Sequence, residues 1–121
     1  PATIRRTLRQ VYIDPTNVDE ELVEAIRRPS LDPGAFGVFR TVFDIPRGQP
    51  LDALFAELNA PLLLIWGIRD PWINAEGRRE RFQRHAPAAT TEVVLQAGHC
   101  PHDEVPSIVN EQLLQWLGTL P

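Results

Sequence analysis

The sequence contains no methionine and no lysine, and its single cysteine is Cys100. One cysteine excludes an intramolecular disulfide and fits a reducing compartment such as the cytoplasm. No apolar run approaches the roughly 20 residues that cross a bilayer, so we expect no transmembrane segment. Residues 1–6 show no apolar core of a signal peptide. Because no initiator methionine is present, we expect that the chain was processed or cut from a longer one.

Positive charge is also scarce. Twelve arginines face sixteen acidic residues, which gives a net charge of −4. No basic stripe interleaved with aromatic residues occurs, so we expect no nucleic-acid partner. Hydrophobic residues make up 43% of the chain and charged residues 23%, which is typical of a folded globular protein and not of a disordered tail. A length of 121 residues suffices for one small domain.

The first half of the chain has the hydrophobic periodicity of helices. The pattern predicts helices over residues 20–28, 35–43 and 51–58. Asn17 or Asp19 can cap the first of them, and Pro29 is expected to end it. Turn chemistry separates the elements, as at residues 14–17 and 32–34. The second helix carries phenylalanines at i, i+3 and i+7, which form one apolar face.

The hydrophobic periodicity changes near residues 60–61, where the second half of the chain begins. Residues 61–67 form a continuous apolar run between breakers, which predicts a strand buried on both faces, and residues 90–95 predict a second strand. Helices are expected over residues 76–85 and 105–117. The connection between the strands is long enough for a crossover helix, so the strands should be parallel. A two-stranded parallel sheet does not stand alone, and we expect the chain to be part of a larger α/β fold.

An acid and a histidine follow the two predicted strands. Asp70 comes after the first strand and His99 after the second. Parallel strands bring both loops to the same edge of the sheet, where an acid can orient a histidine as a general base. Gly67 and Gly98 are expected to relieve steric limits where each strand turns. Taken singly, Asp70 before a proline fits simple turn chemistry, and His99 fits a structural histidine.

Two segments resemble a known family. Residues 63–72, Leu-Leu-Ile-Trp-Gly-Ile-Arg-Asp-Pro-Trp, resemble the segment around the triad acid of the α/β-hydrolases. Residues 97–106, Ala-Gly-His-Cys-Pro-His-Asp-Glu-Val-Pro, resemble the segment around the triad histidine. The Gly-His-Cys-Pro-His-Asp-Glu string is similar to the pheophytinase-like branch of plastids and cyanobacteria. Residues 11–14, 21–24 and 34–39 are similar to the helical cap of that branch.

The resemblance implies a fold and a chemistry. It implies a partial α/β-hydrolase fold, with a helical cap segment over residues 1–58 and the carboxy-terminal part of the core over residues 59–121. Asp70 would hold the imidazole of His99, which would act as the general base for a serine. The cap would roof an apolar pocket whose candidate lining residues are Phe36, Phe39 and Phe43, although plain packing within the cap also explains them.

The implied substrate is a hydrophobic small-molecule ester, such as the phytyl ester of a chlorophyll derivative. Relatives of the same fold cleave halides, epoxides or carbon–carbon bonds. No cofactor and no metal are implied. The branch resemblance would place the protein inside a plastid or a cyanobacterium, as an alternative to the cytoplasm.

The nucleophile of such an enzyme is not in this sequence. No Gly-x-Ser-x-Gly elbow occurs, and the oxyanion loop is absent as well. The serines are Ser30, before a turn, and Ser107, at the start of the last predicted helix. We therefore expect the isolated chain to be inactive, with the missing amino-terminal half of the same fold as its partner. The remaining hypothesis of a different class is a non-catalytic interaction module on a hydrolase scaffold.

Three further groups of residues allow other interpretations. Cys100 could act as a nucleophile beside His99, although neighbours on an extended segment point apart and packing is its default role. His99, His102, Asp103 and Glu104 offer metal-ligand types, with His85 elsewhere, but zinc needs three or four converging ligands. We expect His102 and Asp103 to brace the loop and cap the last helix. The arginines of the crossover helix, Arg78, Arg79, Arg81 and Arg84, fit a solvated face better than an anion site.

Overall fold

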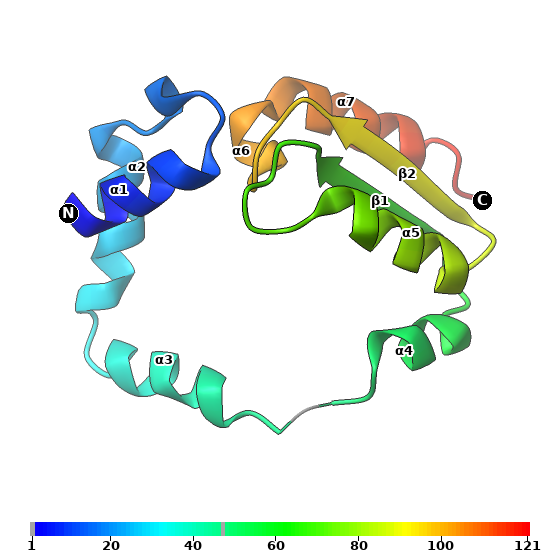
Figure 1. The fold of residues 1–121 in the computed structure, drawn as a ribbon, viewed down its shortest axis with the longest axis horizontal. Coiled ribbons are helices and arrows are strands. Elements are labelled where there is room, and N and C mark those ends of the chain that lie inside the picture. Colours follow the sequence, from blue (N-terminus) through cyan, green and yellow to red (C-terminus); the bar gives the residue numbers. More distant parts are fainter. Residues whose placement is uncertain (1, 47) are drawn as a thin grey trace.

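The structure is a computed structural model that describes residues 2–46 and 48–121. Helices come first and a strand–helix–strand–helix unit follows (Figure 1). The elements are α1 (Ala2–Val11), α2 (Glu20–Arg27), α3 (Ala35–Asp44), α4 (Leu51–Glu57), β1 (Leu62–Gly67), α5 (Ala75–His85), β2 (Thr90–Leu95), α6 (Pro101–Glu104) and α7 (Pro106–Leu117). Short 3-10 turns occupy Pro15–Asn17 and Arg28–Leu31.

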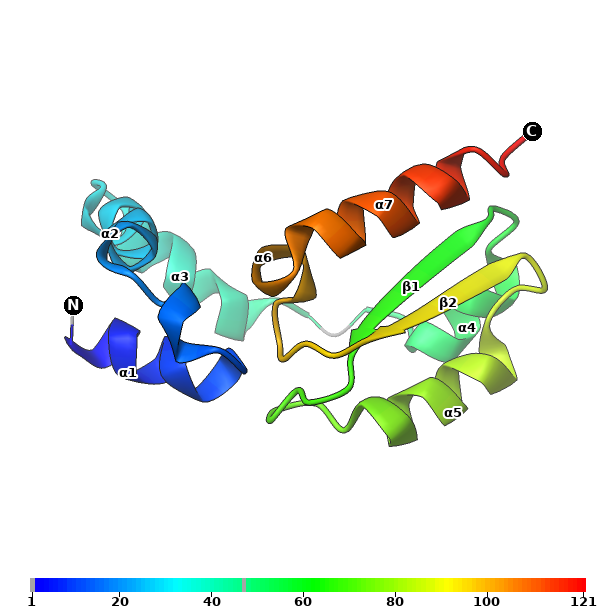
Figure 2. The ribbon, with the colours of Figure 1, turned by 90° about the horizontal axis from the view of Figure 1, so that it is seen from above.

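The sheet has the predicted parallel order. β1 pairs with β2 from Leu62 opposite Thr90 to Gly67 opposite Leu95. In Figure 2, α5 covers one face of the sheet and α7 covers the other. A helix that connects two parallel strands is expected to pack back on the sheet in this way. This arrangement confirms a partial α/β fold. The residues of β1 are only half-buried, except Gly67, because two strands and one helix on each face cover them incompletely.

Aromatic rings fix the crossover helix against the sheet. Phe82 of α5 packs edge-on against Trp66 of β1, with ring centroids 5.2 Å apart. Phe55 of α4 contacts the same phenylalanine at 5.0 Å. Such edge-to-face pairs are worth about 1 kcal/mol beyond the area they bury. Phe82 therefore joins α4, α5 and β1.

A second apolar cluster lies between α1 and α2. Val11, Tyr12, Val18 and Val23 are buried, and Cys100 packs against them from the loop after β2. The side chain of Asp19 caps α2 by accepting from the N–H of Leu22 at 2.8 Å, as one of the two expected caps. The cluster connects the first helices of the chain to the carboxyl edge of the sheet, where α6 lies beside the end of α1 (Figure 1).

Several predicted boundaries differ from the structure. The helix α1 was not among the predicted elements, although Ile4, Leu8 and Val11 follow each other at helical spacing. The helix α2 ends at Arg27, just before Pro29 as predicted and one residue short of the expected bound, and Pro29 sits near the start of a 3-10 turn, where its missing N–H costs nothing. The closing helix is preceded by the separate short helix α6.

The helix α3 exposes its apolar residues. Gly34, at a φ of 86°, forms the expected turn before α3. Val38 and Val42 are exposed together with the phenylalanines of this helix, and Phe39 and Phe43 contact each other edge-on at 5.5 Å. In Figure 1, α3 lies apart from the sheet. Among the residues described, no helix combines the length and apolar character needed to span a membrane.

Candidate active site

Asp70 and His99 meet at the carboxyl edge of the sheet. Asp70 lies in the turn after β1 and His99 in the loop after β2. The carboxylate oxygen Oδ2 of Asp70 lies 2.8 Å from Nδ1 of His99, although the residues are 29 positions apart. This closeness follows from the parallel order of the strands, as the sequence predicted. The catalytic role of the pair stays a prediction.

The carboxylate of Asp70 is fully engaged. Its Oδ1 accepts hydrogen bonds from the N–H groups of Trp72 at 2.8 Å and Ile73 at 3.0 Å. The side chain is 10% exposed. Burial by itself raises the pKa of Asp70, but the hydrogen bonds from His99, Trp72 and Ile73 together outweigh it, and the pKa lies below its ordinary value. Asp70 is therefore both a turn-forming residue and a charged partner of His99, one oxygen for each.

The imidazole of His99 is held on one side and open on the other. With a proton on Nδ1 that is donated to Asp70, the opposite nitrogen Nε2 carries a lone pair. The side chain is 31% exposed. The ring of Trp72 lies against it, with centroids 5.0 Å apart and planes tilted by 59°. An imidazole oriented in this way can accept a proton at Nε2 from a group placed outside the loop.

The two loops approach each other at the glycines. A Cβ at Gly67 would lie 1.8 Å from the carbonyl oxygen of Gly98, and one at Gly98 would lie 2.3 Å from that of Val11. Neither has a positive φ, which among the described residues is found at Gly34 only. The expectation that they relieve a steric limit is confirmed, and the limit is contact with neighbouring backbone and not a left-handed φ. They are needed because backbone passes directly beside them.

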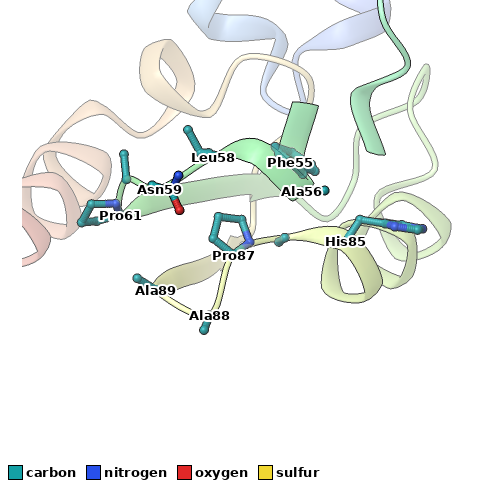
Figure 3. Close-up of a pocket in the computed structure, with 11 residues that line it drawn as sticks. Phe55, Ala56, Leu58, Asn59, Pro61, His85, Pro87, Ala88 and Ala89 are labelled. Carbon is teal, nitrogen blue, oxygen red and sulfur yellow. The ribbon is translucent and has the colours of Figure 1, made fainter. Parts of the chain in front are cut away.

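A small hollow borders the pair. It measures about 160 Å3 and is lined by Ile65, Trp66, Gly67, Asp70, Ile73, Ala75, His99 and Pro101. Apart from the acid and the histidine, its lining side chains are apolar or aromatic. A larger hollow of about 480 Å3 lies at the opposite end of the strands, beside Pro61 and Ala89 (Figure 3). That second hollow does not include the Asp70–His99 pair.

The predicted substrate-binding phenylalanines lie elsewhere. Phe36, Phe39 and Phe43 on α3 are 79%, 63% and 76% exposed. Phe36 and Phe39 line a hollow of about 700 Å3 that contains neither Asp70 nor His99. The structure therefore does not bring them together with the pair, nor does it pack them in a core. Their role in substrate binding stays a prediction.

Cys100 lacks the surroundings of a nucleophile. Its side chain packs against the cluster formed by α1 and α2. Burial raises the pKa of the Cys100 thiol, and the nearby carboxylates of Asp103 and Glu104 add to this effect. A thiol that resists deprotonation is a poor nucleophile. The packing role assigned by default accounts for this residue.

The acids after His99 do not cap α7. The N-cap of α7 is Val105, without a side-chain hydrogen bond. Asp103 instead accepts a hydrogen bond from the hydroxyl of Tyr12, and Glu104 accepts one from the N–H of Ile13 at 2.7 Å. The expected cap of α7 by His102 and Asp103 is therefore wrong, while Asp103 does brace the loop; His102 is exposed, and its bracing stays a prediction. Over residues 2–46 and 48–121, no group of three metal-ligating side chains is placed to hold an ion.

Two of the arginines on α5 form ion pairs. Arg79 binds Glu92 of β2 through two hydrogen bonds of 2.9 and 3.0 Å. Arg81 binds Asp52 of α4 in the same manner at 3.0 Å. These contacts tie the helix to its neighbours, which favours a structural role over an anion site.

The sequence is similar to two known proteins. No protein-family model and no solved structure matches the chain. Over 97% of its length it is 31% identical to "Pheophytinase, chloroplastic" of Arabidopsis thaliana, and over 94% it is 25% identical to the "Uncharacterized hydrolase YugF" of Bacillus subtilis (strain 168). Both are α/β-hydrolases. The chain spans 25% of the length of the first and 41% of the second. The resemblance predicted from the sequence is confirmed.

Proposed function

We propose that this chain, which forms part of the α/β-hydrolase fold, supplies the acid and the general base of a serine esterase. The observation that carries the proposal is the 2.8 Å contact between Asp70 and Nδ1 of His99 at the carboxyl edge of the parallel sheet. An acid bound to Nδ1 fixes the tautomer in which Nε2 can accept a proton. The similarity to two hydrolases supports the same chemistry.

The proposed reaction has two halves. His99 takes the proton from a serine hydroxyl while the serine oxygen attacks the ester carbonyl, and then gives that proton to the departing alcohol. A water molecule next loses a proton to His99 and attacks the acyl-serine, and the proton returns to the serine as the acid is released. Asp70 stabilises the imidazolium that forms twice in this cycle. General acid–base catalysis of this kind contributes about 10²- to 10⁴-fold to the rate.

The serine comes from a part of the fold outside this chain. Ser30 donates its hydroxyl to the carbonyl of Arg27 at 2.6 Å, and Ser107 lies in the first turn of α7. Neither is on a strand-to-helix elbow, where a serine of this fold is presented to the histidine. The proposed partner is therefore the segment that carries the remaining strands and the elbow.

The proposed substrate is an ester with a hydrophobic alcohol or acyl group. The name of the similar pheophytinase points to pheophytin, which suggests the phytyl ester of a chlorophyll derivative. The exposed apolar face of α3, with Phe36, Phe39 and Phe43, supports a cap over residues 1–58 that closes on such a group in the complete fold. Halide, epoxide and carbon–carbon-bond hydrolysis are the alternatives within the fold.

A fluorophosphonate probe tests the proposal. The polypeptide that joins this chain to the remaining strands is labelled as wild type, His99→Ala and His102→Ala. Labelling of wild type at a serine is expected, with a rate about 10³-fold or more lower in His99→Ala. His102 is exposed on the neighbouring turn of α6 and serves as the matched control, with labelling close to wild type.

Two results would contradict this function. Undiminished labelling of His99→Ala would remove His99 from the reaction. A folded wild-type protein that takes up no probe and hydrolyses no ester would instead support the interaction module, in which the scaffold is kept and the chemistry is lost.

A further inference from the structure

Glu104 connects the loop that carries His99 with the end of α1. Its Oε1 accepts hydrogen bonds from the N–H of Gly98 at 2.8 Å and from that of Cys100 at 3.4 Å. Its other oxygen, Oε2, accepts from the N–H of Ile13 at 2.7 Å. The two oxygens of one carboxylate therefore serve two segments that lie about 90 positions apart in the sequence.

The backbone N–H of His99, which lies between Gly98 and Cys100, also has a hydrogen-bond acceptor. The N–H of His99 donates to the carbonyl of Val11 at 2.9 Å. The N–H groups of residues 98, 99 and 100 thus all have acceptors, two on Glu104 and one on α1. The hydroxyl of Tyr12 adds a bond to Asp103. Gly98 lies so close to Val11 that a side chain would not fit between them.

These contacts leave the loop little freedom. The direction of the His99 side chain depends on the backbone of residues 98–100, and a carboxylate holds that backbone from both sides. A charged acceptor makes stronger hydrogen bonds than a neutral one. Buried amides that lost it would also be left without partners.

We propose that Glu104 is a positioning residue for His99, and that it makes the orientation of the imidazole depend on the docking of α1 and α2. The inference rests on the proposed function, since it concerns the same histidine. In this role Glu104 touches neither substrate nor serine. It keeps Nδ1 within reach of Asp70 by holding the loop against α1.

Glu104→Gln is the decisive substitution. An amide has one oxygen in place of two, so its NH₂ group must face either the N–H of Ile13 or those of Gly98 and Cys100, donor against donor. Glu104→Gln therefore loses the hydrogen bonds either to Ile13 or to Gly98 and Cys100, with almost no change in side-chain volume. Glu111→Gln, on the exposed side of α7, removes the same charge at a site that does not contact the His99 loop, and it is the matched control.

The kinetics of ester hydrolysis are measured in the polypeptide that contains the serine. We expect Glu104→Gln to lower kcat by about 10- to 100-fold with little change in KM, because a shift of the base by about 1 Å has that effect. We expect Glu111→Gln to leave both constants as in wild type. A Glu104→Gln protein with wild-type kcat, in a background where His99→Ala abolishes activity, would overturn the positioning role and leave the proposed function intact.

A measurement on the same serine-containing polypeptide is independent of activity. In proton NMR, the Nδ1–H of His99 bound to Asp70 is expected as a downfield resonance in wild type and Glu111→Gln, and as broadened or absent in Glu104→Gln. If Glu104→Gln does not fold, Tyr12→Phe replaces it, since it removes the hydroxyl that binds Asp103 and keeps the ring. Faster hydrogen exchange of the His99 amide is then expected, and unchanged exchange would overturn the coupling to α1.

Discussion

A methyl group added at Gly67 would meet backbone that cannot rotate away. The new Cβ would lie 1.8 Å from the carbonyl oxygen of Gly98 and 2.6 Å from that of Ala97. Because real Cβ contacts are essentially never shorter than 3.0 Å, the loop after β2 has to move by more than 1 Å. That movement would break the hydrogen bonds from Ile68 to Leu95 and from Arg69 to Ala97, at 3.0 and 3.1 Å.

The expected loss follows from these contacts. Overpacking of this kind costs about 1–3 kcal/mol. Each of the two backbone hydrogen bonds contributes about 1 kcal/mol more. We therefore expect Gly67→Ala to lower the free energy of unfolding by about 3–5 kcal/mol, a large part of the stability of a small domain, which is about 5–15 kcal/mol.

Gly37→Ala is the matched control. Gly37 lies inside α3, and among the described residues nothing stands within 4 Å of a Cβ there. Alanine is the better helix former, so this variant should be as stable as wild type or more stable by up to about 1 kcal/mol. Urea unfolding followed by tryptophan fluorescence compares the midpoints at constant m-value. If Gly67→Ala loses no more than Gly37→Ala, the close approach of the two loops is not real.

Two further outcomes are expected. Burial raises the pKa of Asp70 but its hydrogen bonds hold it below the ordinary value of 3.8, so its carboxylate stabilises the fold above that value, and the contribution is lost as the pH falls through the depressed pKa. Urea midpoints measured against pH should fall less steeply below pH 3.8 in Asp70→Asn, and an unchanged slope would show that the carboxylate contributes nothing. Replacing Phe36, Phe39 and Phe43 by glutamine should lower the free energy of unfolding by no more than about 1–2 kcal/mol, because all three are exposed and the lost contact is the edge-on pair of Phe39 and Phe43. The same variant should raise KM for long-chain esters without slowing the small fluorophosphonate, whereas an unchanged KM would exclude these residues from the substrate site.

The position of the Asp70–His99 pair could be predicted because it depends on backbone order. Two apolar runs joined by a long connection define parallel strands, and parallel strands place their following loops at one edge. Neither inference needs the identity of the neighbouring side chains. The strand Thr90–Leu95 and the helix ending at Leu117 agree with the prediction for the same reason.

The hydrogen bonds between the end of α1 and the segment that follows His99 could not be predicted in this way. Tyr12 and Asp103 are 91 positions apart, as are Ile13 and Glu104. Nothing in local spacing indicates that such residues meet. The steric limit at Gly67 and Gly98 could be predicted but its source could not, because a sharp turn and a close approach of backbone both select glycine and the sequence does not distinguish them.

The surroundings of Phe36, Phe39 and Phe43 could not be predicted from the sequence either. Their i, i+3, i+7 spacing correctly indicates one face of α3, but periodicity does not say what covers that face. In the structure they are exposed, and the hollow beside Phe36 and Phe39 is separate from the Asp70–His99 pair.

The proposed function requires that Asp70 holds His99 in the tautomer of a general base. The most direct measurement is kcat for ester hydrolysis by Asp70→Asn, in the polypeptide that contains the serine, with the fold checked by circular dichroism. An asparagine preserves the shape but can present its NH₂ group to Nδ1 and stabilise the wrong tautomer, so we expect kcat to fall by about 10⁴-fold. A kcat within about tenfold of wild type, a difference of only about 1.4 kcal/mol in the barrier, would contradict the claim.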